Sequence, residues 1–411
     1  MGSEDYELVA EPTAVMPSRS FRQLVAGDQH LCGIDAATGE TVCWGCVLAR
    51  PARFVKRLGA GAEAYASEKP LAVAGGHNFT QLSIGSHHAC GVTAEKATFC
   101  WGSNRDFQLG VSNVGQSNVP LPVDGGLLFE SISADDTHTC GVLLNASGVC
   151  FGLTGDGAAW CAGSNWMGGL GNDLESSTGD SAELVAVHGG LQVSSLVSGN
   201  DFTCGLLRSD NATANQTVYC WGDNVGGVMG DYRRCVNSSD PGLPTGDAAN
   251  GCPVAADYRA LHPVPVFPDF QFSLLSAGEQ GTIAAQVCGI AAGTRQGQLY
   301  CWGSNSYGQL AAGLEAEDVY YLEPQLAQSE PPTNRFTSVS VGAQHVCAIA
   351  VDGTLFCAGN NEDGRLGIQD SLNFSTKLLP VAGGRTWAAV NAGNVHTCAI
   401  DAETRAAYCW G

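Results

Sequence analysis

The residues of this chain that could do chemistry are cysteines and histidines that recur at a regular spacing. Cys347 and Cys357 are ten residues apart, and His345 stands two residues before the first of them. Two thiolates and an imidazole are typical zinc ligands. Two cysteines alone can instead form a disulfide. Because the arrangement recurs along the chain, its variation from copy to copy decides between the two.

Seven cysteine pairs follow this pattern, and no copy lacks its pair. The pairs are Cys32/Cys43, Cys90/Cys100, Cys140/Cys161, Cys204/Cys220, Cys288/Cys301, Cys347/Cys357 and Cys398/Cys409. Two copies replace the histidine, with Phe202 and Gln286, and keep both cysteines. A set of metal ligands would not tolerate that loss, so we predict disulfides and no metal site. Each bridge is expected to contribute roughly 2.5–3 kcal/mol to stability.

Other catalytic or cofactor-binding patterns do not rise above chance. Glycine-rich stretches such as Val225-Gly226-Gly227 lack the lysine of a phosphate-binding loop. Asp135-Asp136 is a lone acidic pair at a turn, without the spacing of a calcium loop. No order of serine, histidine and aspartate suggests a nucleophilic triad. We therefore predict no catalytic residues and no cofactor.

Short strands must position the cysteines. In the copy at residues 336–367, alternating apolar residues such as Val339 and Val341 indicate half-buried strands, and Asp352-Gly353 marks a tight turn between two of them. A hairpin with a three-residue loop sets Cys347 and Cys357 directly opposite each other, about 4.5 Å apart at Cα if they form a non-hydrogen-bonded pair.

The complete repeat is longer than the hairpin. Copies start at Phe21, Phe79, Phe129, Val193, Phe272, Phe336 and Trp387. Most copies continue with W-G-x-N and G-x-L-G, which are turn signals. Fourth strands are expected at Val119–Val123, Ala182–Val187, His262–Phe267 and Lys377–Val381. Seven four-stranded antiparallel meanders predict an all-β, seven-bladed propeller that occupies residues 1–411 as one domain.

Closure of the ring requires a strand from the other end of the chain. The last copy stops at Trp410-Gly411, before its fourth strand. Glu7–Pro12 resembles the fourth strand Glu183–Val187 and precedes Phe21 much as those strands precede the next copy. We therefore expect the N-terminal strand to close the last blade and to remove the exposed sheet edges.

The fourth copy carries the longest insertion, Gly230–Leu261. It holds Cys235 and Cys252 among proline, glycine, aspartate and asparagine, so we expect a disulfide-stapled surface loop. Cys46 and Cys150 are left over, free or joined to each other. Cys150 lies ten residues after Cys140 and could replace Cys161 as its partner. We prefer Cys161 because the sequence after it continues the repeat.

Composition limits the compartment and the partners. The chain has 411 residues, 18 cysteines and a formal net charge of −21. The charge argues against nucleic acid and anionic membrane surfaces, and no run of 18 apolar residues occurs. The cysteines favour an oxidising compartment. Six glycosylation sequons agree weakly with secretion: Asn78, Asn145, Asn211, Asn215, Asn237 and Asn373. We expect an extracellular or lumenal protein, although the first residues lack the pattern of a secretory signal.

The repeat resembles that of a known family. The pattern Phe-x-x-(Val/Ile/Leu)-x-(Ala/Val/Ile)-Gly-x-x-His-x-Cys, followed by Cys-Trp-Gly-x-Asn and Gly-x-Leu-Gly, looks like the regulator of chromosome condensation repeat. The resemblance implies a seven-bladed propeller, closed in some members by a strand from the opposite terminus. The paired cysteines are similar to those of plant crinkly-type receptor kinase ectodomains and secreted microbial propellers. The nuclear founder of the family promotes nucleotide exchange on a small GTPase.

These features favour a non-catalytic, extracellular or lumenal propeller that binds a protein or another ligand, free-standing or as a receptor ectodomain. One alternative is an intracellular propeller that acts as a scaffold or resembles a nucleotide-exchange factor. Another is a secreted enzyme inhibitor. We expect a monomer in each case.

The binding face follows from strand order. In a meander, the turn between strands one and two emerges on the same side as the connection between strands three and four. That side receives the long insertions, whereas most sequons fall on the opposite, hairpin side. We assign binding to the long-loop side, with Arg233, Arg234, Tyr320 and Tyr321 as candidate contact residues.

Overall fold

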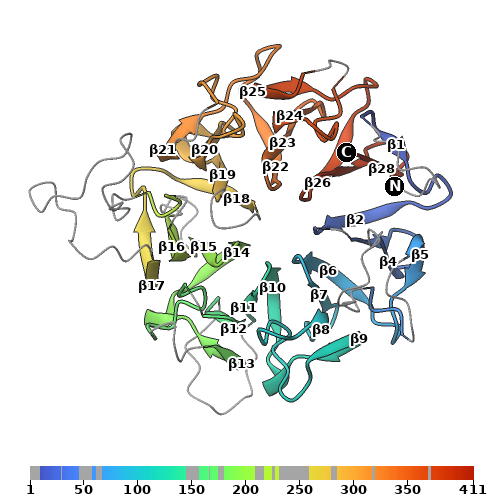
Figure 1. Ribbon diagram of the computed structural model, residues 1–411, viewed down its shortest axis with the longest axis vertical. Helices are drawn as coiled ribbons and strands as arrows, with labels where there is room; N and C mark the ends of the chain where they lie inside the picture. Colours follow the sequence, from blue (N-terminus) through green and yellow to red (C-terminus); the bar gives the residue numbers. More distant parts are fainter. Residues whose placement is uncertain are drawn as a thin grey trace, which may run out of the picture.

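Seven small sheets surround a central axis in the computed structural model of the chain (Figure 1). Each sheet is a four-stranded antiparallel meander, and the first strand of each blade lies nearest the axis. The structure describes residues 10–28, 30–45, 58–61, 67–144, 157–165, 167–174, 180–208, 217–224, 227–230, 259–278, 285–316, 320–368 and 372–411. The predicted all-β, seven-bladed propeller is confirmed.

The seven blades share one order of strands. In chain order they are β2 (Phe21–Ala26), β3 (Leu31–Asp35), β4 (Thr41–Gly45) and β5 (Ser67–Ala72); β6 (Phe79–Ile84), β7 (His88–Thr93), β8 (Thr98–Ser103) and β9 (Gln116–Pro122); β10 (Phe129–Ala134), β11 (His138–Leu143), β12 (Ala159–Gly163) and β13 (Ser181–Ala186); β14 (Val193–Gly199), β15 (Phe202–Leu207), β16 (Val218–Asp223) and β17 (Arg259–Val266).

The last three blades follow the same plan. Their strands are β18 (Phe272–Gly278), β19 (Gln286–Ala291), β20 (Leu299–Ser304) and β21 (Tyr320–Leu326); β22 (Phe336–Val341), β23 (His345–Ala350), β24 (Leu355–Asn360) and β25 (Phe374–Pro380); and β26 (Trp387–Ala392), β27 (Thr397–Asp401) and β28 (Ala407–Trp410) with β1 (Thr13–Ala14). Among the described residues, three short 3-10 helices lie in the connections: η1 (Asp124–Gly126), η2 (His188–Gly190) and η4 (Gly293–Arg295). The fourth strands overlap the predicted ranges but begin a few residues earlier.

The seventh blade is closed by β1, which pairs with β28 in the register Thr13↔Cys409 and Ala14↔Tyr408. The prediction that the N-terminal strand closes the last blade is confirmed, but the described pairing is at Thr13–Ala14, just after the predicted range Glu7–Pro12. Pro12 has no N–H to donate to a sheet, and Ala10 still lies against Gly364 of the sixth blade. Among the described residues, pairing with the seventh sheet begins at Thr13, and residues 1–9 lie outside the described part.

The paired cysteines face each other across strands two and three of every blade. Cys347 and Cys357 are register partners with a Cα–Cα distance of 4.1 Å, slightly less than the sequence suggested. The disulfides are Cys32–Cys43, Cys90–Cys100, Cys140–Cys161, Cys204–Cys220, Cys288–Cys301, Cys347–Cys357 and Cys398–Cys409. Cys140 thus pairs with Cys161, and its alternative partner Cys150 lies outside the described residues.

The turn that follows strand three of the sixth blade connects it to the seventh. The Arg365 carbonyl oxygen accepts hydrogen bonds from Thr397 Oγ1 at 2.8 Å and from Trp410 Nε1 at 3.0 Å, both in the seventh blade. The turn is held in shape by asparagine: Asn361 Oδ1 accepts the N–H of Leu366 at 3.0 Å. The W-G-x-N and G-x-L-G segments are therefore parts of the contacts between blades as well as turn signals.

Glycine is required at the bulge in strand three. Gly102, which follows Trp101, has φ of 112° and lies where the register of β8 against β9 shifts. A Cβ atom there would lie 2.6 Å from His88 Cα on the adjacent strand. A side chain at this position would meet both the unfavourable dihedral angle and the neighbouring backbone.

Three of the recurrent histidines, His88, His138 and His345, bond to threonines of the next blade. His88 Nε2 lies 2.7 Å from Thr139 Oγ1, and His345 Nε2 lies 2.8 Å from Thr397 Oγ1. Thr139 already donates its hydroxyl hydrogen to the Gln108 carbonyl, so it must accept from a protonated Nε2. The hydrogen bond therefore places a proton on Nε2. The histidines therefore hold neighbouring blades together.

Burial makes protonation of these histidines unfavourable. It lowers the pKa of His88 to about 3 and that of His396 to about 4, and it holds the pKa of His345 well below its ordinary value. Acid conditions thus oppose the contacts that the neutral rings make.

Replacing one partner of a blade disulfide is expected to weaken the protein without abolishing the fold. Cys357→Ser should lower the free energy of unfolding by roughly 2–4 kcal/mol, because the unfolded chain regains loop entropy. Denaturant unfolding of oxidised wild type and variant measures the difference, and a thiol assay should detect Cys347. The difference should largely vanish once both proteins are reduced. Equal stability of the oxidised proteins would contradict the bridge.

Acid should destabilise the ring, and one histidine substitution should reduce the effect. An unfolded histidine takes up a proton near pH 6.5, whereas folded His345 does not, so stability is present above that pH and is lost as the pH falls. The loss is about 1.4 kcal/mol per pH unit for each such histidine. His345→Gln, which copies Gln286 of the fifth blade, should make the slope of unfolding free energy shallower by about one proton between about pH 6 and 4.5. An unchanged slope would contradict a neutral His345.

Candidate binding face and central cavity

The turns between strands one and two and the connections between strands three and four form one face of the ring, here called the long-loop face. Hydrogen bonds join the connection after strand three of one blade to the turn between strands one and two of the next. Gln108 Nε2 donates to the Asp136 carbonyl oxygen at 3.4 Å, and Arg365 Nη1 donates to the Asn394 carbonyl oxygen at 3.3 Å. The strand order assumed from the sequence is therefore the observed one.

Two of the predicted contact residues do not lie in a loop. Tyr320 and Tyr321 are the first residues of β21, and both are half-buried. Tyr321 packs against the core of the fifth and sixth blades, because strand pairing begins earlier than the insertion pattern suggested. Several other predicted residues lie outside the described part: Cys46, Cys150, Arg233, Arg234, Cys235, Cys252, Asn145, Asn211, Asn215 and Asn237. The sequons at Asn78 and Asn373 are both exposed.

Exposed apolar side chains concentrate on the long-loop face. Among the described residues, eight large apolar side chains are exposed: Phe107, Leu174, Leu274, Leu326, Val351, Leu372, Phe374 and Val395. Strand order places five of them, Phe107, Leu174, Leu372, Phe374 and Val395, at the long-loop ends of the blades. Val351, by contrast, lies in the hairpin between β23 and β24. Sequence reasoning missed these residues, because exposure of a single apolar residue has no local pattern.

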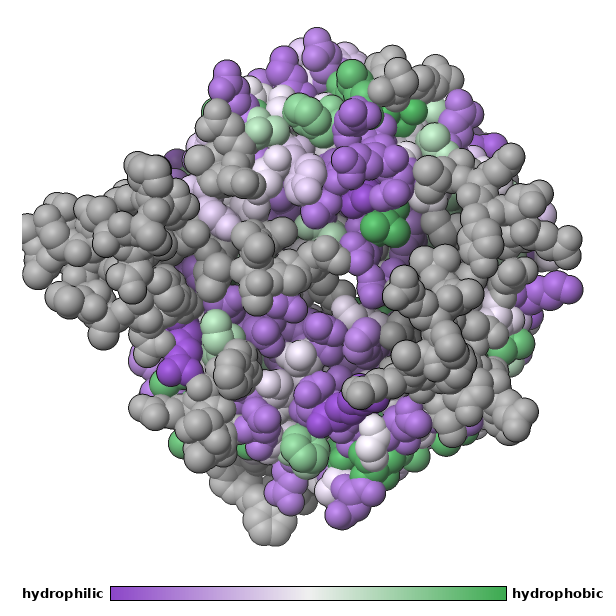
Figure 2. Space-filling model, in the orientation of Figure 1, coloured by the Kyte–Doolittle hydropathy of each residue, from purple (hydrophilic) through white to green (hydrophobic). Residues whose placement is uncertain are grey.

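A polar cavity of about 150 Å³ lies on the ring axis. Hydroxyl groups of the innermost strands line it and link successive blades. Ser83 Oγ accepts the N–H of Ala134 at 2.9 Å, and Ser133 Oγ accepts the N–H of Ser198 at 2.9 Å. Ser276, Ser340 and Asn391 accept equivalent bonds in other blades. The described residues that Figure 2 shows around the central opening are mostly hydrophilic.

Three half-buried carboxylates stand in the turns that directly follow the cavity wall. Asp28 accepts a hydrogen bond from Asn394 Nδ2, and Asp201 Oδ1 accepts one from Thr137 Oγ1 at 2.8 Å. Asp136 lies between them in the ring, close to His87. Among the described ion pairs, none joins a lysine or arginine to these carboxylates. This end of the cavity, the acidic mouth, therefore carries excess negative charge.

Crowding of the carboxylates affects their protonation. Burial raises the pKa of Asp136, and the charges of Asp201 and Asp28 raise it further, against opposing contributions from His87 and Ser86. Burial and the charge of Asp135 likewise raise the pKa of Asp201. Asp136 and Asp201 therefore take up a proton more readily than a free aspartate does.

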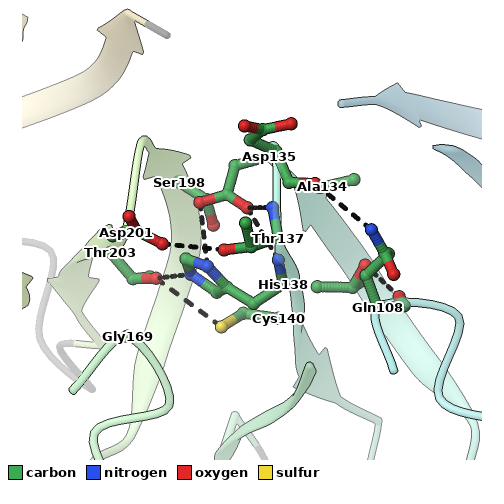
Figure 3. Close-up of polar contacts among 12 residues, drawn as sticks. Gln108, Ala134, Asp135, Thr137, His138, Cys140, Gly169, Ser198, Asp201 and Thr203 are labelled. Atoms are coloured by element: carbon green, nitrogen blue, oxygen red, sulfur yellow. Dashed lines mark hydrogen bonds and ion pairs between the residues drawn. The ribbon is translucent and has the colours of Figure 1, made fainter. Parts of the chain in front are cut away.

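The third blade adds a fully buried ion pair beneath the acidic mouth (Figure 3). Asp135 Oδ2 lies 2.8 Å from His138 Nδ1, and His138 Nε2 lies 2.7 Å from Thr203 Oγ1 in the fourth blade. Asp135 Oδ1 also accepts the backbone N–H groups of Thr137 and His138. Burial lowers the pKa of His138, but the adjacent Asp135 outweighs it and raises the pKa above its ordinary value.

The order carboxylate, imidazole, hydroxyl matches that of a nucleophilic triad, but all three side chains are fully buried. A substrate has no access to the Thr203 hydroxyl, so the arrangement holds blades together. Describing Asp135-Asp136 as a lone acidic pair was therefore wrong for Asp135. The available signal was its position, because the equivalent residue is glycine in the other copies: Gly27, Gly85, Gly199, Gly278, Gly342 and Gly393.

Two further kinds of site find no support in the described part of the chain. No cluster of three histidine, cysteine or acidic side chains there is arranged to hold a metal ion. No helix there is long and apolar enough to cross a membrane.

Comparison with known proteins identifies the type of repeat. Models of the regulator of chromosome condensation (RCC1) repeat match residues 296–349 and 352–400, and also 79–108 and 336–365. The probable E3 ubiquitin-protein ligase HERC4 of Rattus norvegicus is 30% identical over 27% of this chain, and the match spans 10% of that relative's length. The ultraviolet-B receptor UVR8 of Arabidopsis thaliana is 23% identical over 91% of this chain and 73% of its own.

Solved structures agree on the architecture. Prp20p of Saccharomyces cerevisiae aligns with a TM-score of 0.68 and 15% identity, over 95% of this chain and 81% of its own. The CRINKLY ectodomain of the Arabidopsis thaliana receptor kinase ACR4 aligns with a TM-score of 0.51 and 19% identity, over 96% of each chain. At these identities the likeness concerns the fold alone. The repeat matches show that the chain contains regulator of chromosome condensation repeats, at residues 79–108, 296–349 and 352–400, and the seven-bladed ring is the fold that it shares with these solved structures.

Proposed function

We propose that this protein is a non-catalytic binding propeller of an extracellular or lumenal compartment and that it engages a protein partner through the long-loop face. The observation that carries the proposal is the concentration of exposed apolar side chains on that face. Phe107 and Phe374 are 39% and 46% exposed. Exposed aromatic and aliphatic residues on a rigid scaffold are typical anchors of protein interfaces.

The bonded cysteines support the proposal of an extracellular or lumenal compartment. All seven described pairs are bonded and buried, and disulfides in such number persist where the surroundings are oxidising. Cytosolic thiol pools would reduce accessible bridges, and a fold that relies on them would lose stability there.

A second candidate function is that of an intracellular propeller that promotes nucleotide exchange. It is favoured by the similarity of residues in this chain to the secretion-regulating guanine nucleotide exchange factor of Mus musculus, which is 35% identical over 86 residues. That match covers 21% of this chain and 18% of the relative. The two candidates differ in the oxidation state they require.

Thiol counting separates the two compartments. Protein from its native source is alkylated under denaturing conditions, before and after reduction, and analysed by mass spectrometry. The extracellular proposal predicts that the fourteen cysteines of the seven bridges react only after reduction. Free thiols at those positions in the unreduced sample would favour the intracellular candidate.

Site-specific crosslinking tests which face of the ring binds the partner. A photoreactive phenylalanine analogue at Phe374 should yield a discrete protein adduct in the native host, because this side chain is exposed among the long loops. The same analogue at Val351, which is 66% exposed on the hairpin side, is the matched control and should yield none. Adducts at Val351 but not at Phe374 would place the partner on the opposite face.

A further inference from the structure

Two surface histidines from the third and fourth blades face one carboxylate. Asp173 lies in the connection between β12 and β13, His188 in η2 and His262 in the outer strand β17. His262 Nδ1 lies 3.1 Å from Asp173 Oδ1, and His188 Nδ1 lies 3.8 Å from Oδ2 of the same carboxylate. The centroids of the two imidazole rings are 5.8 Å apart. The three side chains therefore meet where the two blades adjoin.

The repeat does not account for these two histidines. The chain has nine histidines. Five of them stand two residues before the first cysteine of a copy: His30, His88, His138, His345 and His396. Of the other four, two meet at Asp173. The Val-x-Gly-Gly segment that contains His188 recurs in other blades with a different residue at this position: Ala74, Asp124 and Ala382. The pair is therefore an addition to the repeat.

Backbone hydrogen bonds hold the three residues in place. The N–H of Asp173 donates to the carbonyl oxygen of Leu261, the neighbour of His262, at 2.8 Å. The N–H of His188 donates to the Gly171 carbonyl oxygen, also at 2.8 Å. The side chains of the three residues are between 49% and 53% exposed. The two rings are thus kept close to each other and remain open to solvent.

Asp173 determines which nitrogen of each ring is free. A carboxylate only accepts hydrogen bonds, so it favours a neutral imidazole with its proton on Nδ1 and a lone pair on Nε2. A histidine that binds a metal through one nitrogen typically donates its other N–H to a carboxylate. Asp173 can do this for both rings. The imidazoles then form a site of two nitrogen ligands, in agreement with the lack of a three-ligand cluster in the described part of the chain.

The separation of the rings fits one shared metal ion. With metal–nitrogen bonds of about 2.0–2.1 Å, each ring centroid lies about 3.2 Å from the metal, so two centroids are about 5.2 Å apart at the tetrahedral angle and about 6.4 Å apart when opposite. The observed 5.8 Å lies in this range. Imidazole nitrogens suit zinc, copper and nickel, whereas magnesium and calcium take oxygen ligands.

We propose that His188 and His262 bind a divalent zinc, nickel or copper ion through their Nε2 atoms, with Asp173 as a positioning residue and water as the remaining ligands. The ion links η2, at the end of the third blade, to the outer strand of the fourth. The disulfides of these two blades each stay within one blade. The proposal uses none of the exposed apolar residues of the long-loop face, so it can fail without affecting the proposed partner site, and the reverse also holds.

The test is isothermal titration calorimetry of the whole untagged, oxidised protein with zinc chloride and nickel chloride. The protein is first alkylated, so that no free thiol can bind the metal. Zinc and nickel should each release saturable heat at about 150 mM salt, where the screening of surface charge suppresses loose ion binding. Copper should bind more tightly than either, and magnesium should give no saturable heat. The proposal fails if zinc and nickel give none up to about 1 mM.

Variants assign the site to its residues. The double variant His188→Asn/His262→Asn should weaken zinc binding by about tenfold or more, because it removes both nitrogen ligands. Asp173→Asn keeps both ligands and should still weaken binding by about tenfold, because the rings lose their carboxylate partner. Asp173→Glu should recover part of that loss. His87→Asn removes another histidine that lies near a carboxylate, Asp136, and is the matched control that should leave the affinity unchanged.

Thermal melting separates loss of the site from loss of the fold. Without metal, the variants should melt within about 1 °C of wild type, because exposed ion pairs contribute little to stability. At a zinc concentration of about a hundred times the dissociation constant, wild type should melt about 3 °C higher. The double variant should show no such shift. A folded double variant that binds zinc as tightly as wild type would overturn the proposal, and equal affinity of Asp173→Asn and wild type would remove Asp173 from the site.

Discussion

Several of the described contacts between blades use the same kind of acceptor, the carbonyl oxygen in the turn after the third strand. Where the set is complete, that oxygen receives a threonine hydroxyl and a tryptophan N–H from the next blade, as Arg365 receives Thr397 and Trp410. Similar bonds run from Trp221 to Gly169 and from Trp302 to Val228. Because these acceptors are buried, losing a donor would leave a polar group unsatisfied. The need to satisfy these buried carbonyl groups explains why threonine and tryptophan recur at fixed positions of the repeat.

The ring of histidines shows how one position can carry two electrostatic states. His88 and His345 are neutral because burial is not offset by a neighbouring carboxylate. His138 has the opposite tendency because Asp135 replaces the glycine found there in other blades. A Cβ atom on Gly85 would overlap the Asp135 carbonyl of the next blade, so most blades have no room for a side chain at this position. The third blade is therefore electrically different within a nearly symmetric ring.

Much of the fold could be predicted from the sequence, because the repeat supplies seven independent examples of the same pattern. Cys347 and Cys357 lie opposite each other as alternation and turn length required. The closing strand could not be located to the residue, because the two residues Thr13–Ala14 are too few to carry an alternating pattern. The site was less predictable still. Asp135 is buried against the neighbouring blade, and Asp28, Asp136 and Asp201 lie in turns of three different blades. Sequence spacing does not record contacts between blades.

The described disulfides all lie within a blade, spanning 10 to 21 residues, and none of them links two blades. Blades are thus joined to one another by hydrogen bonds and packing, while the middle hairpin of each is covalently closed. Under mechanical tension the blades would separate first, one after another. In each separated blade, the residues between the two bonded cysteines would remain a closed loop that cannot be pulled straight. Oxidised protein would therefore stretch less far than reduced protein. The bridges act as a limit on extension, in addition to their part in stability.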